Sequence, residues 1–422
     1  FFSPDVRIYN IPAWDCLPYD RVSPNNSVMS RRIEALCKLA TDNTDNNEAK
    51  IIITTVNSIV QRIADIKFLS QSILQINKGR QADREKVISF LANNGYVRSA
   101  SVNDHGEFAV RGSIIDIFVP GKNEAIRIDF LGNIVEEIRT FDPVLQTTIG
   151  KIEKVELIPA NEVILSNESI ELFKRNYREL FGAITGDDPL FEAVSEGRKY
   201  AGMEHWLPLF HKKMETIFDL VKAPIITFDY NCDKLLDERT ELIKEYYDAR
   251  KNFGKNSISA SEGYKPIPTD LLYLNNDDVA EILSKNMSAI FTPFNIDGGS
   301  DVIDCAYRQV PNLYLEAKGS GKNPIELLKP YKAKTNHSGN RLVISCISEG
   351  SRSRMQAMMA EHSIKAVMCN EWKGVEKLNN EIISLIKLNI KNGFEVPGVT
   401  LITEQDILGE RIVRTEKKKS QS

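Results

Sequence analysis

The sequence has few of the residue patterns that hold metals. Its six cysteines are scattered without a C-x-x-C pair or a nearby histidine cluster, and its five histidines show no ligand spacing. These absences argue against a zinc site and predict reduced, mostly packed thiols in a cytoplasmic protein. We therefore expect neither a metal nor a cofactor. The cysteines are Cys16, Cys37, Cys232, Cys305, Cys346 and Cys369.

Long apolar runs and a strong net charge are also missing. No run approaches about 18 apolar residues and no signal sequence is visible, so we expect a chain that is not exported and does not enter a membrane. The net charge is only −4 with 27% charged residues, which excludes a bulk polycation for nucleic acid and leaves only local DNA contacts. The chain starts at Phe1 without an initiator methionine, and we expect it to be a piece of a longer protein.

What is present is an alternation of strand-like and helix-like segments. At 422 residues the chain predicts about two to four domains. Between residues 6 and 64 the order strand, helix, strand, helix favours parallel pairing in a doubly wound sheet. The stretch 84–158 predicts one helix and then about six short strands, an antiparallel α+β arrangement. Helical periodicity returns in 168–252, and a last α/β unit follows Pro324.

The antiparallel stretch predicts a sheet with one apolar and one charged face. In one of its strands Ile126, Ile128 and Phe130 fall on one side, while Arg127 and Asp129 fall on the other. A solvated face of this kind is the ordinary outer surface of an antiparallel sheet. The sharper interpretation is a docking face for another protein.

A glycine-rich segment, Gly319-Ser-Gly-Lys322, looks like part of a phosphate-binding loop. That loop needs a glycine where Glu316 stands and a serine or threonine where Asn323 stands, so the pattern fails. We expect a flexible linker here instead.

A second pattern lies at the end of an apolar strand, where motor ATPases place an aspartate for Mg²⁺ and a glutamate for water. Asp229 occupies the first position, but Tyr230 occupies the second. Without the second acid there is no hydrolytic pair, so we regard this as a degenerate Walker B position and expect no catalytic residue in the chain.

Four separated motifs stand in order along nearly the whole chain. They are Pro12-Ala-Trp-Asp-Cys-Leu-Pro-Tyr-Asp20, Gly106-Glu-Phe-Ala-Val-Arg-Gly-Ser-Ile-Ile-Asp-Ile-Phe118, Gly202-Met-Glu-His-Trp206 and Leu408-Gly-Glu-Arg411. Together they resemble the amino-terminal part of the bacterial transcription-repair coupling factors, the Mfd family. The second and third motifs are also similar, more distantly, to UvrB, an excision-repair helicase subunit.

The resemblance implies a UvrB-like domain that has lost its ATP site and its lesion-gripping elements, with an inserted domain that binds UvrA, the damage-recognition ATPase. It also implies that the degenerate phosphate-binding loop precedes Phe1. The domain that binds RNA polymerase and the DNA-translocating motor would lie beyond the end of this chain. The implied function is a non-catalytic recruitment module of transcription-coupled nucleotide excision repair. RNA polymerase and DNA would be reached only through parts absent here.

The predicted fold class is α/β. A degenerate RecA/helicase-like parallel-sheet domain is interrupted by an inserted α+β antiparallel domain and followed by a separate small α/β domain. The predicted boundaries are 1–76 and 161–316 for the two parts of the first domain, 77–160 for the insert, 317–323 for a linker, 324–412 for the last domain and 413–422 for a basic tail.

The resemblance also carries over the partner-binding residues. The family's partner-binding arginines match Arg111 and Arg127. The family's hairpin tip reads Phe-Phe-x-Asp-Glu, whereas this chain has the segment Phe130-Leu-Gly-Asn-Ile134, which predicts a weaker contact. The candidate residues for UvrA are Arg111, Arg127, Asp129, Leu131 and Asn133.

We expect both arginines to stand on strands whose opposite face is anchored by apolar side chains. Truncating either one would then cost about 2 kcal/mol of binding and leave the thermal midpoint nearly unchanged. In the opposite interpretation both arginines pair with Asp129 or Glu107 within their own surface, where such pairs contribute little. The expected anchors are Ile114, Phe118, Ile126, Ile128 and Phe130.

Two other functions remain as alternatives. One is a UvrB-type ATP-dependent helicase subunit, but only about ten residues separate Asp20 from Arg31, which leaves no room for the long aromatic hairpin with which UvrB grips damaged DNA. The other is a decayed remnant that folds but binds nothing, for which the altered hairpin tip is the motive.

Overall fold

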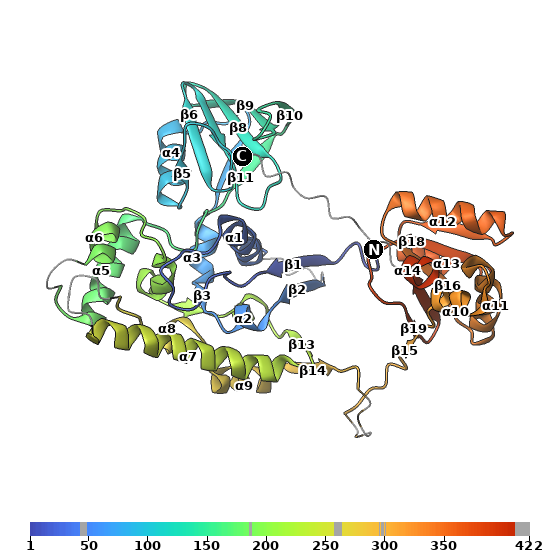
Figure 1. Ribbon diagram of the computed structural model, residues 1–422. Helices are drawn as coiled ribbons and strands as arrows, with labels where there is room; N and C mark the ends of the chain where they lie inside the picture. The colour runs from blue at the N-terminus through green and yellow to red at the C-terminus, as the bar shows by residue number, and fades with distance from the viewer. Residues whose placement is uncertain are drawn as a thin grey trace. The chain divides into compact units, whose positions relative to one another are not determined.

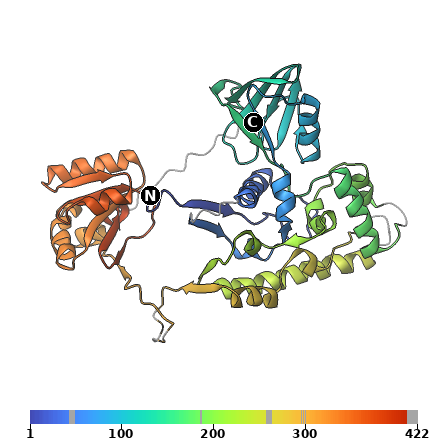
Figure 2. The same cartoon turned by 180° about the vertical axis from the view of Figure 1, so that it is seen from behind.

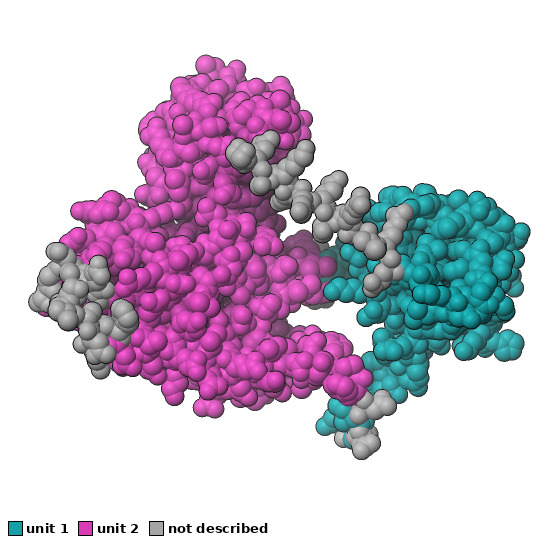
Figure 3. Space-filling view, viewed as in Figure 1, with its two compact units in different colours: residues 1–6, 295–422 teal, residues 7–294 magenta. Residues whose placement is uncertain are grey.

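The computed structural model describes residues 1–42, 49–184, 188–256, 264–294, 296, 299 and 301–409. The chain divides into two compact units, which Figure 3 shows in different colours. We call residues 7–294 the main unit, and residues 1–6 with 295–422 the C-terminal unit. Glu410 and Arg411 of the last sequence motif, and the basic tail 413–422, lie outside the described residues.

The first part of the main unit is built on a parallel pair of strands, β1 and β2, in which Ile8 stands opposite Ile51. Its helix α1 begins after Asn25, whose side chain accepts the backbone N–H of Ser27 and so caps the helix. The elements before the insert are β1 (Arg7–Ile11), α1 (Asn26–Thr41), β2 (Lys50–Thr54), α2 (Val56–Ile59), β3 (Ile63–Ala64) and α3 (Ile66–Gln71).

A second parallel pair joins β13 (Ile225–Asp229) to β14 (Met287–Phe291). We expected one RecA/helicase-like parallel sheet in this unit. The described residues instead form two separate two-stranded parallel sheets, so that arrangement is not seen in them. Parallel strands are normally covered on both faces, whereas here Ile8, Ile53 and Met287 are more than half exposed.

The insert is an antiparallel sheet with one helix against it. Its sheet runs in the order β10-β9-β8-β7-β6-β5, with only the short β5 paired in parallel. The elements are β4 (Leu74–Asn77), α4 (Arg84–Asn93), β5 (Val97–Arg98), β6 (Glu107–Arg111), β7 (Ile114–Ile117), β8 (Ala125–Leu131), β9 (Ile134–Phe141), β10 (Thr148–Lys151) and β11 (Lys154–Leu157). Two-residue loops at Gly112-Ser113 and Gly132-Asn133 make tight hairpins, because each glycine takes a positive φ.

The strands by which the chain enters and leaves the insert pair with each other. β4 and β11 form an antiparallel ribbon in which Leu74 stands opposite Leu157. The Tyr96 hydroxyl donates to the backbone carbonyl of Ile158 beside this ribbon at 2.7 Å. Both connections of the insert are therefore bound together at one place.

The two faces of the six-stranded sheet differ in what covers them. On the inner face Val87 and Leu91 of α4 belong to the same buried cluster as the sheet residues, and Figure 1 shows α4 lying against this sheet. This cluster continues into α1, since it also holds Ile33 and Leu36, so the insert shares its core with the domain that it interrupts. The sheet residues of the inner face are Phe108, Ile115, Ile117, Ile126, Ile128, Phe130, Val135 and Ile138.

The opposite, outer face carries charges and a small apolar cluster. The register pairs Arg111 with Ile114, and Ile114 with Asp129, so Ile114 lies on the charged face. Phe118 also belongs to the outer cluster. We expected both residues among the inner anchors, and this was wrong for Ile114 and Phe118, because the turn at Gly112-Ser113 sets the register of β7. The outer cluster consists of Val102, Ala109, Phe118, Ala125 and Phe141.

The rest of the main unit is mostly helical, and Figure 2 shows the long helix α7 running along it with α9 alongside. Its elements are α5 (Asn167–Phe181), α6 (Pro189–Ser195), η1 (Met203–Phe210), β12 (Met214–Glu215), η2 (Ile217–Leu220), α7 (Cys232–Asn256), α8 (Thr269–Leu272) and α9 (Asn276–Ser284). A second core of aromatic and aliphatic side chains, including Tyr19, Phe173 and Trp206, holds these helices together.

The C-terminal unit is a small α/β structure, as the alternating pattern predicts. Its sheet runs β15-β19-β20-β16-β18-β17, with parallel pairing among the last four. Separate buried clusters cover the two faces of this sheet. The elements are β15 (Arg308–Gln309), α10 (Leu313–Ser320), α11 (Pro324–His337), β16 (Arg341–Cys346), α12 (Glu349–Glu361), β17 (Ala366–Cys369), α13 (Trp372–Lys377), β18 (Ile383–Lys387), β19 (Phe394–Val396), β20 (Val399–Thr403) and α14 (Glu404–Leu408).

The segment expected to be a linker, 317–323, joins two helices of this same unit. Residues 317–320 form the end of α10, Gly321 is its left-handed cap, and Asn323 caps the start of α11. A phosphate-binding loop follows a strand, whereas this turn follows a helix. The geometry agrees with the failure of the sequence pattern at Lys322.

Candidate functional site

The outer face of the insert brings together most of the charged residues that the sequence singled out. Across the strands the register sets Arg127 beside Asp116 on β7 and Arg139 on β9. The neighbouring row runs from Arg111 through Asp129 to Glu137, with Ile114 between. Because these rows are adjacent on the same side of a twisted sheet, their side chains form one polar surface. We call this surface the outer face. It consists of Arg111, Ile114, Asp116, Arg127, Asp129, Glu137 and Arg139.

Arg127 is held on this face from two directions. Its Nε and Nη2 atoms donate to the two carboxylate oxygens of Asp116 at 2.6 and 2.8 Å. Its guanidinium also lies 4.7 Å from the ring centre of Phe141, which is buried. The hydrogen bonds that Arg127 donates to Asp116 raise the pKa of the Arg127 guanidinium, so the group stays charged.

Arg111 is held much more loosely. Its Nη2 atom donates to the backbone carbonyl of Ala100 at 2.8 Å, and its side chain is exposed. Among the residues that the structure describes, no carboxylate lies within ion-pair distance of Arg111. Of the three arginines on the outer face, Arg111 is therefore the one whose charge is left without an internal counterpart in the described chain.

The remaining charges of the outer face form a surface network. Arg139 lies 3.6 Å from Asp129 and 3.0 Å from Glu137, and Lys151 also pairs with Glu137. Asp129 additionally accepts the Ser113 hydroxyl at 3.0 Å. The hydrogen bond from Lys151 lowers the pKa of Glu137. These pairs are solvent-exposed and contribute little to stability, but they leave Asp129 occupied.

The β8–β9 hairpin tip presents apolar rather than acidic side chains. Leu131 and Ile134 are 68% and 51% exposed, whereas Phe130 is buried. The backbone carbonyl of Asn133 accepts the N–H of Ala82 at 2.9 Å, which fixes the tip against the segment before α4. The hairpin tip thus presents exposed apolar side chains beside the charged rows, and a backbone hydrogen bond holds it in place.

The degenerate Walker B position lies apart from this surface, at the end of β13. The Asp229 carboxylate accepts the backbone N–H of Asn231 at 3.3 Å, as a turn residue does, and Tyr230 packs edge-on against Phe294 with ring centres 5.2 Å apart. No group of three or more metal-ligating side chains occurs among the described residues. Asp229 thus stands in a turn, and its neighbour Tyr230 packs on an aromatic ring.

The glycine motif at 202–206 is an internal joint. Gly202 has φ near +75°, and a Cβ there would lie 2.9 Å from the backbone of Asp20 and Arg21. Glu204 is buried and accepts the Ser23 hydroxyl at 2.7 Å. The first and third sequence motifs therefore meet through close backbone approach, which only glycine permits.

A second arginine, Arg32, lies in a buried network under α1. Its Nε donates to Glu162 at 2.7 Å, and its Nη1 donates to the Pro12 carbonyl and the Ser58 hydroxyl. The Trp14 indole N–H donates to the same Glu162 oxygen at 2.9 Å. Arg32 and Glu162 have no exposed side-chain surface, so this network can stabilise the fold but cannot meet a partner.

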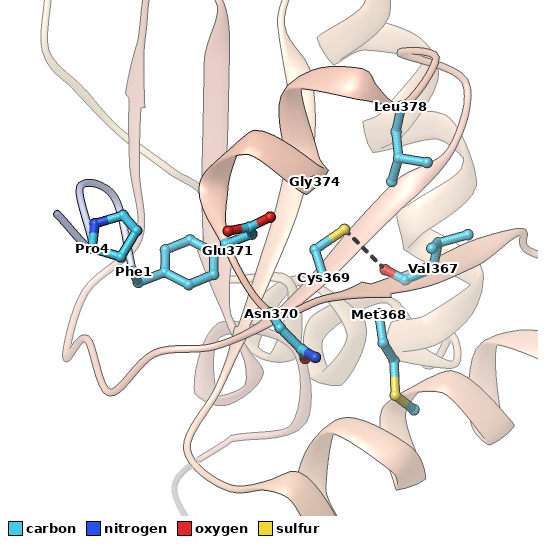
Figure 4. Close-up of a pocket in the computed structure, with 9 residues that line it drawn as sticks. All are labelled: Phe1, Pro4, Val367, Met368, Cys369, Asn370, Glu371, Gly374 and Leu378. Carbon is cyan, nitrogen blue, oxygen red and sulfur yellow. Dashed lines mark hydrogen bonds between the residues drawn. The ribbon is translucent and has the colours of Figure 1, made fainter.

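The C-terminal unit carries a shallow depression between its first residues and the end of β17 (Figure 4). The Cys369 thiol lies 3.9 Å from the carbonyl of Val367, and burial raises the pKa of this thiol. A raised pKa makes this thiol a weaker nucleophile at a given pH.

None of the helices among the described residues is long and apolar enough to span a membrane.

Sequence reasoning missed Asp116 and Phe141, the two residues that hold Arg127. Asp116 sits inside the apolar run Ile114-Ile-Asp-Ile117 and is 1% exposed. A charge in the middle of such a run was the available signal, because a buried carboxylate requires a partner. The proposed pairing of the arginines with Asp129 or Glu107 is not seen, since Glu107 accepts the backbone N–H groups of Asn103 and Asp104.

Two family models and several full-length proteins match this chain. The family described as UvrB interaction domain matches residues 74–163, and the family described as MFD, D3 domain matches residues 335–407. The transcription-repair-coupling factors of Rickettsia conorii and Escherichia coli are 29% and 26% identical to this chain over 97% of it. The chain matches an amino-terminal fragment of a transcription-repair-coupling factor.

The match covers only part of each relative's length. The chain spans about a third of the length of the curated coupling factors that it matches, 35% for Rickettsia conorii and 34% for Escherichia coli. The coupling factor of Myxococcus xanthus is 30% identical over 53% of this chain. The UvrB interaction domain match begins in β4 and ends just after β11, so it coincides with the insert that carries the outer face.

Proposed function

We propose that this chain is a non-catalytic recruitment module of transcription-coupled nucleotide excision repair, and that the outer face of its insert docks UvrA through Arg111 and Arg127. The observation that carries the proposal is Arg111, an exposed guanidinium on a rigid strand with no carboxylate beside it in the described residues. Arginine is a common interface anchor because its fork of N–H donors binds a carboxylate with two parallel hydrogen bonds.

The position of the insert in the family supports the same partner. The match to the UvrB interaction domain covers this sheet, and the coupling-factor relatives cover the chain around it. In this proposal the host domain is a degenerate RecA/helicase-like scaffold that presents the insert. Any contact with RNA polymerase or DNA belongs to the whole coupling factor.

The proposal assigns the hairpin tip a secondary role. Leu131 and Asn133 stand where the family carries an aromatic and an acidic residue. Exposed Leu131 can add apolar contact, but it lacks the larger buried area that an aromatic ring would contribute. Replacing Leu131 with Phe and Asn133 with Asp in this chain is therefore expected to tighten binding.

The test is a titration of the full chain against purified UvrA by calorimetry. Arg111→Ala is expected to weaken binding about thirtyfold, roughly 2 kcal/mol, and to leave the thermal midpoint unchanged. Arg98→Ala is the matched control. Arg98 pairs in register with Phe108, which faces inward, so this substitution removes the same charge from the opposite face of the sheet. Equal affinities of wild type and Arg111→Ala, or no binding by wild type, would contradict the proposal.

The same preparation separates the enzymatic alternative. With Asp229 in a turn and Tyr230 packed on Phe294, we expect no phosphate release from ATP, with or without DNA. Turnover that disappears in Asp229→Asn would instead favour the UvrB-type helicase subunit.

A further inference from the structure

Arg127 differs from Arg111 in how its guanidinium is fixed, and the difference has a consequence for docking. A guanidinium has five N–H donors arranged along two edges that a carboxylate can meet side by side. Asp116 occupies the edge formed by Nε and Nη2, at 2.6 and 2.8 Å. In the described residues Nη1 has no hydrogen-bond partner, and the Arg127 side chain is 19% exposed.

The carboxylate that holds Arg127 is itself buried. Asp116 is 1% exposed, stands in the middle of β7, and lies directly opposite Arg127 in the register of β7 with β8. Phe141, from β9, lies under the plane of the guanidinium. Three strands therefore fix the orientation of a single cationic group, and they leave its Nη1 atom without a described partner and outside the set of buried unpaired atoms.

We infer that Asp116 is a positioning residue for partner binding: it holds Arg127 so that the outer Nη1–Nη2 edge meets a partner carboxylate end-on. This inference rests on the proposed function. The side-on edge of Arg127, which a free arginine would use most readily, is already taken. Arg127 can therefore accept a partner acid in one orientation only, while loosely held Arg111 adapts to a second acid nearby.

Fixing a long side chain in advance lowers the cost of binding. An interface that must order a flexible arginine loses about two- to twelvefold in affinity for that side chain. In Asp116→Asn the amide can accept only one of the two N–H bonds and offers an N–H₂ group against the other. We expect this variant to bind UvrA roughly three- to tenfold more weakly than wild type.

The first measurement is the order of the Arg127 side chain itself, by ¹⁵N relaxation of its Nε–H group in the full chain. We expect a rigid group in wild type and a mobile one in Asp116→Asn. Glu136→Gln removes one negative charge from the exposed part of β9 without touching Arg127, and should leave that group rigid. An equally ordered Arg127 in wild type and Asp116→Asn would overturn the inference.

The second measurement is a double-mutant cycle in the UvrA titration, with thermal midpoints measured alongside. If Asp116 acts through Arg127, Asp116→Asn weakens binding in wild type but has no further effect in the Arg127→Ala background. A merely structural role would weaken binding equally in both backgrounds, and this would overturn the inference.

The outcomes also separate this inference from the proposed function. Tight binding that is the same in wild type and Asp116→Asn would overturn the positioning role and leave the docking face standing. Absence of binding in every variant, including wild type, would overturn the proposed function and the inference with it.

Discussion

Two arginine–carboxylate pairs in the main unit differ in their hydrogen bonds and in their access to solvent. Arg32 of α1 donates to one oxygen of Glu162 at 2.7 Å, whereas Arg127 donates to both oxygens of Asp116, at 2.6 and 2.8 Å. Arg127 and Asp116 lie on neighbouring strands, whereas Glu162 lies in a loop. The Arg32 side chain has no exposed surface, whereas that of Arg127 is 19% exposed.

The comparison teaches that access to solvent decides what a fixed arginine can do, because Arg32 also has an unbonded Nη2 atom, but that atom is buried. Arg32 also donates from Nη1 to the Pro12 carbonyl and the Ser58 hydroxyl, so its charge is part of a buried internal network. Arg127 has one carboxylate partner and a ring beneath it, and its side chain stays partly exposed. The same pair of groups is thus fully enclosed in one place, and in the other it stands on the surface that we propose for docking.

The largest expected loss of folding stability concerns the buried pair of Arg32 and Glu162. Arg32→Ala leaves the Glu162 carboxylate buried without its cation, which typically costs about 3–5 kcal/mol of folding stability. Urea unfolding of wild type and variant measures this loss. A matched Arg31→Ala change, one residue away on the exposed side of α1, should cost less than about 0.5 kcal/mol. Equal stabilities of the two variants would contradict the assigned role of Arg32.

The folding stability of the main unit should also depend on pH, because two buried neutral histidines, His205 and His211, lie in it. Burial lowers the pKa of His205 and of His211 to about 4. The unfolded chain takes up these protons near pH 6.5, so stability is complete above that pH and falls as the pH drops toward 4. At pH 5 the loss is about 2 kcal/mol for each histidine.

Unfolding midpoints between pH 7.5 and 5 test this expectation. His205→Gln removes one titrating group and should flatten the pH dependence by the share of that histidine. A pH dependence identical to wild type would show that His205 does not stay neutral in the fold.

The third and smallest effect distinguishes the two arginines of the outer face. We expected both truncations to leave the thermal midpoint nearly unchanged, but Arg127→Ala removes the partner of Asp116, a carboxylate that is 1% exposed. Leaving this carboxylate unpaired costs about 1–3 kcal/mol. Arg111→Ala breaks only a bond to a backbone carbonyl, so its cost should be near zero.

Thermal melts of the two variants measure this difference, and Asp116→Asn added to Arg127→Ala should recover much of the loss. Equal melting of Arg111→Ala and Arg127→Ala would show that the Asp116 pair does not contribute to stability. Because Arg127→Ala changes both folding and binding, Arg111→Ala is the cleaner probe of docking.

Part of this site could be predicted from the sequence because it depends on local periodicity. Alternation along β8 separates Arg127 from Ile126 and Ile128, and the short link around Gly132 predicts the hairpin. These features need only the two-residue repeat of a strand and the φ preference of glycine.

The rest depends on register between strands, which no single segment contains. The register between β7 and β8 sets Asp116 opposite Arg127, and the two-residue turn at Gly112-Ser113 between β6 and β7 places Ile114 on the charged side. Glu162 likewise reaches Arg32 across residues distant in sequence. The expected single parallel sheet depends on neighbouring strands in the same way, since the order of segments predicts parallel pairing but not which strands pair, and the described strands pair in two separate parallel sheets.

The ribbon of β4 and β11 also bears on the order in which the chain can fold. An unfolded insert would be a long flexible loop between α3 and α5, and closing that loop costs entropy before the host gains any contact. Once the insert has folded, Leu74 and Leu157 are already paired, and the two parts of the interrupted domain begin and end on neighbouring strands. We therefore expect the insert to fold first and the host to complete its core afterwards. Pulse-labelled hydrogen exchange should find the amides of β8 protected earlier than those of α5.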